Sequence, residues 1–276
     1  MKADLHCHSY ISDGLLAPAA VVRRAAANGV ELLALTDHDE TSGLDEAREA
    51  ARALNLRFLN GVEISVTWRD STIHIVGLGI DPDNAELGAG LATIRAGRDE
   101  RAKKIAEGLA EIGIHGALEG AALHVKNANL IGRVHFARFL VKQKLARDVS
   151  SVFEHYLVRG KPGYVEHRWA DLEQAVAWIT AAGGIAVIAH PGRYNLSTNQ
   201  RGHFYSAFKA CGGGGIEVCY GTRNASQQQE AARVARKYGF AASCASDFHG
   251  VGESRADLGA ISPLPEDLTP VWAGLM

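Results

Sequence analysis

The chain has 276 residues, a formal net charge of −2, 47% hydrophobic residues and 22% charged residues. This balance is typical of a globular protein and excludes a disordered chain, and the length allows one large α/β domain with a substantial core. No apolar run approaches the roughly 18 residues of a membrane span, and no secretory leader is evident, so we expect a cytoplasmic protein. The four cysteines, Cys7, Cys211, Cys219 and Cys244, lack C-x-x-C spacing and are expected to be reduced core residues.

The first 80 residues alternate between strands and helices. The opening strand runs into residues 4–8, where His6 and His8 share one face because they are two positions apart. Apolar periodicity and turn residues predict helices over 18–28 and 43–54, and strands over 31–39, 57–65 and 72–79. Glu63 lies inside an apolar strand and is expected to have a partner, because burying an unpaired carboxylate is costly.

The alternation of strands and helices is interrupted between residues 81 and 163. Helices are predicted there over 95–112, 131–146 and 149–158. The stretch from Arg95 to Lys161 carries thirteen Lys and Arg against seven Asp and Glu, a net charge of about +6, which leaves the rest of the chain near −8. We therefore expect three parts: a first barrel part at 1–80, a helical insertion at 81–163 that forms a substrate-binding cap, and a second barrel part at 164–276.

Strands and helices alternate again after the insertion. Helices are predicted over 171–182, 204–209 and 227–238, and strands over 185–189, 216–220 and 241–245. His190 follows the first of these strands, while Asp247 and His249 follow the last with the spacing seen at His6 and His8. Seven strands alternating with helices indicate a parallel α/β barrel, in which the carboxyl ends of the strands meet at one mouth.

Nine side chains with nitrogen or oxygen donors are expected at that mouth: His6, His8, Asp13, His38, Glu63, His74, His190, Asp247 and His249. Nine ligands are too many for one ion, but they suit three divalent ions with Glu63 as a bridge. The mixed imidazole and carboxylate set fits Mn²⁺, Fe²⁺ or Zn²⁺. Asp37 is expected either to orient a ligand imidazole or to cap the following helix.

These motifs occur in an order that resembles one known family. His6-x-His8, Thr36-Asp37-His38, Glu63, His74, Ala189-His190-Pro191 and Ser246-Asp247-Phe248-His249 resemble the motif set of the PHP (polymerase and histidinol phosphatase) family of amidohydrolase-like enzymes. The resemblance covers nearly the whole chain. It implies a distorted (β/α)7 TIM-like barrel with a helical insertion, and a trinuclear centre, with manganese as the expected metal, that hydrolyses phosphoesters.

The resemblance also implies how the ligands divide among the ions. His6, His8, Glu63 and Asp247 would hold the first ion, Glu63, His74 and His190 the second, and Asp13, His38 and His249 the third. A metal-bound hydroxide held by His6, His8, Glu63, Asp247 and His249 is then expected to attack phosphorus in line, without a covalent phosphoenzyme.

The insertion narrows the expected substrate. Residues 131–138 and 156–165 are similar to segments of a bacterial branch of the family. That branch removes the 3′-phosphate of nucleoside 3′,5′-bisphosphates, such as adenosine 3′,5′-bisphosphate, and leaves the 5′-monophosphate. Arg133, His135, Lys161 and Arg193 are expected to bind the second phosphate of such a substrate.

Other functions remain open at this point. Related members act as 5′-to-3′ exoribonucleases on short 5′-phosphorylated RNA, and a basic insertion could follow a phosphate backbone. A histidinol-phosphate phosphatase also fits the metal motifs alone. A non-catalytic, polymerase-associated module is disfavoured by the complete ligand set. The expected partner is thus a small nucleotide or a short RNA, with no membrane and no obligate protein partner.

Overall fold

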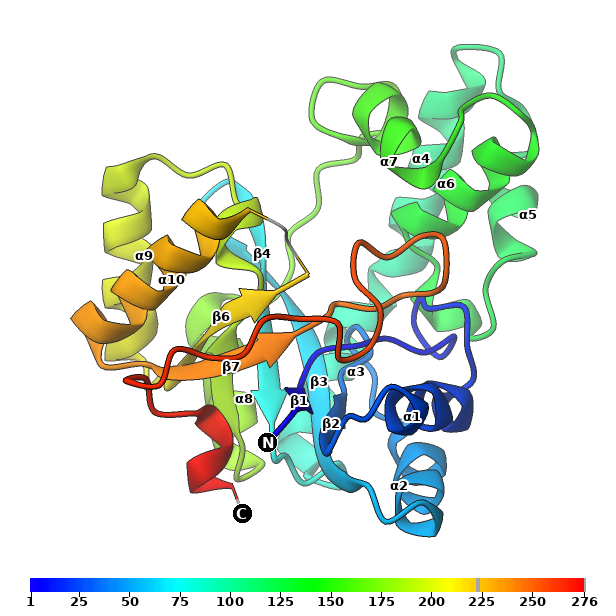
Figure 1. Ribbon diagram of the computed structural model, residues 1–276. Helices are drawn as coiled ribbons and strands as arrows, with labels where there is room; N and C mark the ends of the chain where they lie inside the picture. Colours follow the sequence, from blue (N-terminus) through cyan, green and yellow to red (C-terminus); the bar gives the residue numbers. More distant parts are fainter. Residues whose placement is uncertain (222–223, 276) are drawn as a thin grey trace.

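The computed structural model describes residues 1–221 and 224–275, and it is built around one seven-stranded sheet (Figure 1). The strands follow one another in space in chain order: β1 (Ala3–Asp4), β2 (Leu32–Leu35), β3 (Arg57–Trp68), β4 (Ser71–Leu78), β5 (Ile185–Ile188), β6 (Gly215–Tyr220) and β7 (Ala241–Ala245). Strands β1 to β3 pair in parallel, and so do β5 to β7, whereas β4 is antiparallel to both of its neighbours.

The first and last strands lie side by side, which nearly closes the sheet into a barrel. The backbone N–H of Leu5 donates to the carbonyl of Cys244 at 2.8 Å, and that of Asp247 donates to the carbonyl of His6 at 2.9 Å. These bonds join the first and last strands of the sheet at the segments that carry His6 and Asp247. The expected distorted (β/α)7 barrel is confirmed.

The prediction that helices separate all seven strands is wrong for β3 and β4. Only Arg69 and Asp70 connect these two strands, which form an antiparallel hairpin. A parallel pair would need a crossover of a dozen or more residues, so this connection is too short for one. Because β4 runs in the opposite direction, its first half is the half that reaches the mouth, where His74 pairs with Ser65 of β3.

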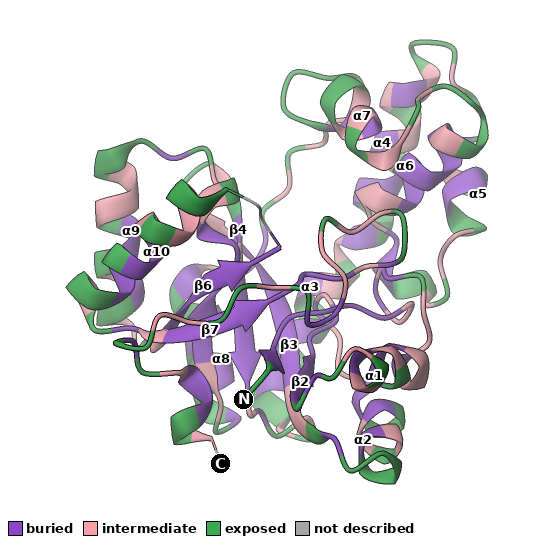
Figure 2. Ribbon diagram, viewed as in Figure 1, coloured by how far each residue is buried: buried purple, intermediate pink, exposed green. Residues whose placement is uncertain are grey.

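Helices cover the outside of the barrel: α1 (Pro18–Ala27), α2 (Leu44–Ala53), α8 (Leu172–Ala181), α9 (Thr198–Ala210) and α10 (Ala225–Tyr238). Their buried faces turn toward the sheet, and their exposed faces turn outward (Figure 2). Local sequence sets their ends: Ser197 and Gln200 cap the start of α9 through reciprocal bonds of 2.8 and 3.3 Å, and α10 ends at Gly239 with φ +66°. None of the helices at 1–221 and 224–275 is long and apolar enough to cross a membrane.

The segment between β4 and α8 is mainly helical, with α3 (Ala85–Ala96), α4 (Arg98–Ala110), α5 (Ala117–Ala122), α6 (Arg133–Lys142), α7 (Val149–Val152) and a π-helical turn at Phe153–Leu157. Leu87, Leu91 and Ile94 of α3 pack into the barrel core, whereas buried residues from Ala102 to Leu157 form a second core. Figure 1 shows α4 to α7 grouped beside the barrel. The domain limits at residues 80/81 and 163/164 stay a prediction.

Candidate metal centre and substrate cleft

The structure brings all nine expected donor residues together at the barrel mouth. They come from the loop after β1, the ends of β2, β5 and β7, and the interiors of β3 and β4: His6, His8, Asp13, His38, Glu63, His74, His190, Asp247 and His249. Five of these residues are buried, and the other four, Asp13, His38, His74 and His249, are partly exposed and line the cleft described below. Residues spread over more than 240 positions of sequence thus share one site.

Glu63 lies at the centre of this cluster. Its Oε2 atom is 3.2 Å from Nε2 of His6, 3.4 Å from Nε2 of His8 and 2.9 Å from Nδ1 of His38. Its Oε1 atom accepts hydrogen bonds of 3.0 Å from His74 and from His190. One carboxylate therefore contacts five imidazoles. The expectation that Glu63 bridges metal ions stays a prediction.

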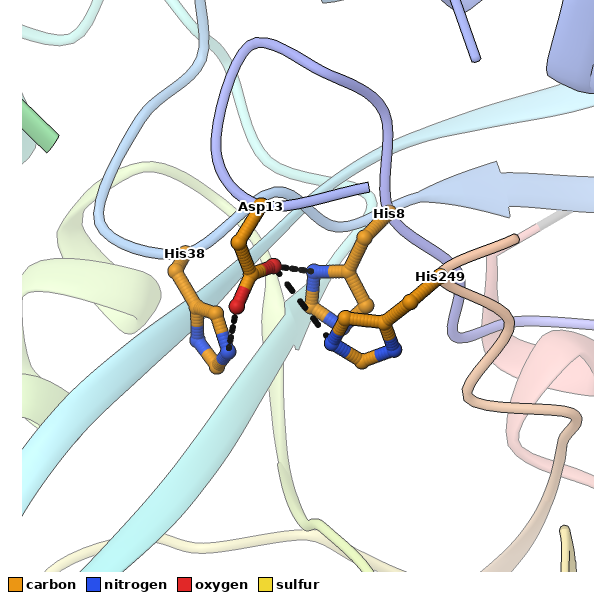
Figure 3. A group of neighbouring side chains, drawn as sticks. All are labelled: His8, Asp13, His38 and His249. Atoms are coloured by element: carbon orange, nitrogen blue, oxygen red, sulfur yellow. Dashed lines mark ion pairs between the residues drawn. The ribbon is translucent and has the colours of Figure 1, made fainter. Parts of the chain in front are cut away.

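Asp13 gathers a second group of imidazoles, drawn in Figure 3. Its Oδ1 atom lies 3.8 Å from Nδ1 of His8 and 3.4 Å from Nε2 of His249, and its Oδ2 atom lies 3.8 Å from Nε2 of His38. Gly14 makes the tight turn possible, because a Cβ there would lie 2.5 Å from the carbonyl oxygen of His8. The turn folds Asp13 back over His8.

Asp247 completes the cluster on the β7 side. Its Oδ1 atom lies 3.5 Å from Nε2 of His6 and 3.3 Å from Nε2 of His8, and its Oδ2 atom is ion-paired with Arg193. Burial would raise the pKa of Asp247, but Arg193 and His249 hold it well below its usual range. The carboxylate is therefore ionised near neutral pH and available as a ligand.

The donor atoms approach one another as ligands around cations do. Nδ1 of His8, Nδ1 of His38 and Oε2 of Glu63 are buried without a hydrogen-bond partner in the part of the chain that the structure describes. Two donors on one ion at metal–nitrogen distances of about 2.1 Å lie about 3.0–3.4 Å apart. The 2.9–3.4 Å contacts around Oε2 of Glu63 match this spacing without hydrogen-bond geometry. The residues present thus fit divalent metal ions.

Three groups of residues could each hold an ion, because the donor atoms within each group lie within 4.8 Å of one another. The groups are His6 with His8 and Asp247, His38 with Glu63 and His74, and His8 with Asp13, His38 and His249.

In the metal-free protein, protons on the imidazoles balance the negative charge of the carboxylates. Burial would lower the pKa of His38, but the carboxylates of Glu63 and Asp13 outweigh it and raise the pKa to about 9. Metal ions would replace such protons, because an imidazole must be neutral to bind an ion.

Sequence reasoning missed Glu217, which lies on β6 and holds two of the cluster's residues. Its Oε1 atom is 2.6 Å from Nδ1 of His6, and its Oε2 atom accepts a 2.5 Å hydrogen bond from the backbone N–H of His190. A proton on Nδ1 leaves Nε2 of His6 free to face the cluster. The signal was present, because Glu217 is a carboxylate inside the apolar strand Gly215–Tyr220, just as Glu63 is in β3.

Asp37 does neither of the two things expected of it. Its carboxylate accepts hydrogen bonds from the backbone N–H and hydroxyl groups of both Ser9 and Ser12, at 2.6–3.3 Å. The N-cap of α2 is Gly43, without a side-chain bond. Asp37 therefore fixes the loop that carries Asp13.

A cleft of about 600 Å³ opens beside the donor cluster. Asp13, His38, His74, Asp247 and His249 line it on the barrel side, and Arg98, Arg101, Arg133, Val149 and Phe153 line it on the insertion side. Of the four expected substrate-binding residues, Arg133 and Arg193 line this cleft. The buried His135, 1% exposed, and the exposed Lys161 are not among its lining residues.

Two arginines that sequence reasoning missed also line the cleft. The guanidinium groups of Arg98 and Arg101 lie 4.8 and 5.1 Å from the ring centre of Trp169, and Arg98 is ion-paired with the buried Asp39. Nε of Arg101 has no hydrogen-bond partner among the described residues. Burial, with Arg133 and Arg98 nearby, lowers the pKa of Arg101 to about 9. This wall of the cleft is short of negative charge and suits an anion.

Residues 4–239 match the family model of the PHP domain. The chain belongs to the PHP family. The match covers strands β1 to β6, the insertion and seven of the nine donor positions, and it ends after α10. Strand β7 and the segment with Asp247 and His249 follow it. The resemblance drawn from the motifs is thereby confirmed.

Several known PHP relatives cover almost the whole chain. A Chromobacterium violaceum protein named 3′,5′-nucleoside bisphosphate phosphatase is 49% identical over 99% of this chain and 95% of its own. A 5′-3′ exoribonuclease of Haemophilus influenzae is 40% identical over 98% of each chain, and 5′-3′ exoribonuclease Rnm of Escherichia coli is 43% identical over 89% of this chain and 84% of its own.

Solved structures agree with the fold. A C. violaceum amidohydrolase, solved with sulfate and no metal, superposes with a TM-score of 0.97 at 49% identity, over 100% of this chain and 96% of that one. A Bifidobacterium adolescentis protein described as a metal-dependent phosphoesterase superposes with a TM-score of 0.82 at 29% identity, over 98% and 95% of the two chains.

Proposed function

We propose that this PHP protein is a metal-dependent phosphatase that removes the 3′-phosphate of nucleoside 3′,5′-bisphosphates, such as adenosine 3′,5′-bisphosphate, and leaves the 5′-monophosphate. Family membership and the C. violaceum relative support the reaction class. One observation carries the substrate assignment: a single cleft of about 600 Å³ has a cluster of metal-type donors on one wall and three arginines on another. Such a cleft suits a compact molecule with two phosphates.

The proposal includes three divalent ions, with Mn²⁺ as the expected metal and Fe²⁺ or Zn²⁺ as alternatives. The residues that would hold them are the nine expected donors, His6, His8, Asp13, His38, Glu63, His74, His190, Asp247 and His249. The unpartnered donor atoms around Glu63 support this assignment. Bound ions of this kind lower the pKa of water and offset negative charge on a phosphoryl group.

Arg193 is assigned to the phosphate that is removed. It lies on the loop after His190, lines the cleft and is ion-paired with Asp247, so it stands at the metal end of the site. Asp247 uses one terminal nitrogen of the guanidinium, which leaves further N–H groups for a phosphoryl oxygen. This differs from the sequence expectation that Arg193 would bind the second phosphate.

The second phosphate is assigned to the insertion wall. Arg133 was expected there, and Arg98 and Arg101 join it because all three line the same cleft. Phe153, which is partly exposed, also lines the cleft and offers an apolar surface for a nucleobase. A role for His135 and Lys161 as substrate contacts stays a prediction, and the cleft's lining gives it no support.

A 5′-to-3′ exoribonuclease is the second candidate. Two relatives at 40% and 43% identity carry that name, and the 5′-phosphate of an RNA could occupy the same arginine wall. A histidinol-phosphate phosphatase fits less well, because the amine of histidinol is a cation and would face Arg98, Arg101 and Arg133.

We also propose a cytoplasmic location, since all four cysteines are free, as is usual in a reducing compartment.

The test compares three substrates on Mn²⁺-loaded protein at matched concentrations: adenosine 3′,5′-bisphosphate, a short 5′-phosphorylated RNA and histidinol phosphate. The proposal predicts phosphate and 5′-AMP from the bisphosphate at the highest kcat/KM. Glu63→Gln, which alters the central carboxylate, serves as the inactive control. Rapid shortening of the RNA to mononucleotides, with little phosphate from the bisphosphate, would replace the phosphatase assignment with the nuclease.

A further inference from the structure

Arg138 connects the helical insertion to the barrel mouth. It lies on α6 and is 7% exposed. Its Nη2 atom donates a 2.6 Å hydrogen bond to the backbone carbonyl of Asp13. Its Nε and Nη2 atoms also bind the carboxylate of Glu253, at 3.0 Å to Oε1 and 2.7 Å to Oε2. One guanidinium therefore joins three separate segments of the chain.

Arg138 contacts two loops, one with Asp13 and one with Glu253, and these loops carry Asp13 and His249. With His8 and His38, these two residues form a group of possible metal donors, called the Asp13 pocket below. The hydroxyl of Ser254, the neighbour of Glu253, accepts hydrogen bonds from the backbone N–H groups of His249 at 2.7 Å and Gly250 at 3.0 Å. The backbone N–H of Leu15 donates to the carbonyl of His249 at 2.6 Å. Arg138 thus closes a ring of bonds around the pair formed by Asp13 and His249.

The chemistry of this contact favours Arg over any other residue. A planar guanidinium can bind a carboxylate through two parallel bonds and still offer a third N–H group, which an ammonium group on a flexible stem does less well. Removing it would leave the partly buried Glu253 carboxylate and the carbonyl of Asp13 without these donors. Such losses cost more than the bond itself contributes.

We propose that Arg138 is a positioning residue that couples the seating of the insertion on the barrel to ion binding in the pocket of His8, Asp13, His38 and His249. The inference rests on the proposed function, because it needs an ion in that pocket. Coupling of this kind is reciprocal. An ion in the pocket holds α6 in place, and α6 also carries Arg133 of the phosphate-binding wall.

The test measures metal content and backbone protection, with no substrate present. Metal-stripped wild type, Arg138→Lys, Arg138→Ala and Glu253→Gln are titrated with Mn²⁺ by calorimetry, and bound metal is counted by elemental analysis after gel filtration. Lys142→Ala, which removes an exposed cation from the same helix, is the matched control. We expect one of three ions to bind at least tenfold more weakly in the Arg138 variants, with a smaller loss in Glu253→Gln and none in Lys142→Ala.

Hydrogen exchange separates positioning from a general loss of stability. Residues 9–14, 249–255 and α6 should exchange faster in Arg138→Lys while β2 and β5 keep wild-type protection. If Arg138→Ala does not fold, Arg138→Lys and Glu253→Gln still decide the matter. Three ions with wild-type affinities in these two variants would overturn the inference, even if their melting temperatures fall. If the wild-type protein binds no ion in the Asp13 pocket, the proposal of three ions is wrong, and so is the inference about Arg138.

Discussion

The carboxylate of Glu217 lies 2.6 Å from Nδ1 of His6 and is 1% exposed at the centre of β6. Its second oxygen accepts the backbone N–H of His190. Glu217 does not face the cleft, yet it fixes the imidazole of one expected metal ligand and the backbone of another. Carboxylates in this position set the tautomer of a ligand histidine and raise its basicity.

The variant Glu217→Gln should therefore bind metal more weakly. The amide has one donor and one acceptor in place of two acceptors, so it cannot satisfy both Nδ1–H of His6 and N–H of His190. We expect Mn²⁺ affinity to fall about 10- to 100-fold, measured by competition with a chelating dye. Glu173→Gln, on the exposed face of α8, is the control. Unchanged affinity in a folded Glu217→Gln protein would contradict this role.

The arginine wall predicts a selective loss of substrate binding. Arg101→Met keeps the aliphatic packing against Trp169 but removes the charge. Hydrogen bonds to charged groups contribute about 1.5–3 kcal/mol, so KM for adenosine 3′,5′-bisphosphate should rise about 10- to 100-fold.

Adenosine 3′-monophosphate lacks only the 5′-phosphate, so its KM should not change in Arg101→Met. Lys104→Met, on the exposed side of α4, should behave as wild type with both substrates. Equal losses with the two substrates would show that Arg101 does not read the second phosphate.

His135 predicts part of the acid sensitivity of the fold. Burial outweighs the nearby Asp13 carboxylate and lowers its pKa to about 4. In the unfolded chain the His135 side chain has a pKa near 6.5, so on acidification it takes up its proton before the folded protein does. Its contribution to the free energy of unfolding is therefore complete above about pH 6.5 and is lost as the pH falls toward 4. At pH 5.0 the loss from this residue is about 2 kcal/mol.

Urea unfolding of the metal-free protein at pH 7.5 and 5.0 measures this loss. His135→Gln should lose about 2 kcal/mol less than wild type between the two pH values. The glutamine can still accept the N–H of Gly132, which His135 accepts at 3.0 Å. His115→Gln, at an exposed site of the insertion, should keep the wild-type dependence. Parallel pH curves for wild type and His135→Gln would rule out this contribution.

Metal binding should release protons near neutral pH. His38 has a pKa of about 9 in the metal-free protein, because Glu63 and Asp13 outweigh its burial, so it is protonated at pH 7.5. It must lose that proton to bind an ion. Calorimetric titration with Mn²⁺ in buffers of different ionisation enthalpy should report release of protons, and His38→Asn should release about one fewer. Equal release from both proteins would show that His38 does not carry an exchangeable proton.

Sequence alone predicted that nine side chains would lie together, because barrel geometry brings strand ends to one mouth, and the structure places them there. Their role as metal ligands stays a prediction. Sequence reasoning gave β4 the wrong direction, because the apolar pattern of a strand does not show which way the strand runs. The two-residue connection to β3 is too short for a parallel crossover. Sequence reasoning also missed Arg98 and Arg101, because charged residues on an amphipathic helix normally face solvent, and only the packing of α4 on Trp169 shows otherwise. Ser9 and Ser12, the partners of Asp37, lie more than 20 residues away along the chain, so local reasoning could not find them.

Under the proposed function, one cleft binds both phosphates of the substrate and cleaves only one of them. The most direct measurement is the ratio of kcat/KM for adenosine 3′,5′-bisphosphate to that for adenosine 3′-monophosphate on the Mn²⁺-loaded wild type. Two or more charged contacts to the 5′-phosphate predict a ratio of at least about 100, with 5′-AMP as the product of the bisphosphate. A ratio near one would mean that the arginine wall does not recognise the substrate, and the bisphosphate assignment would be wrong.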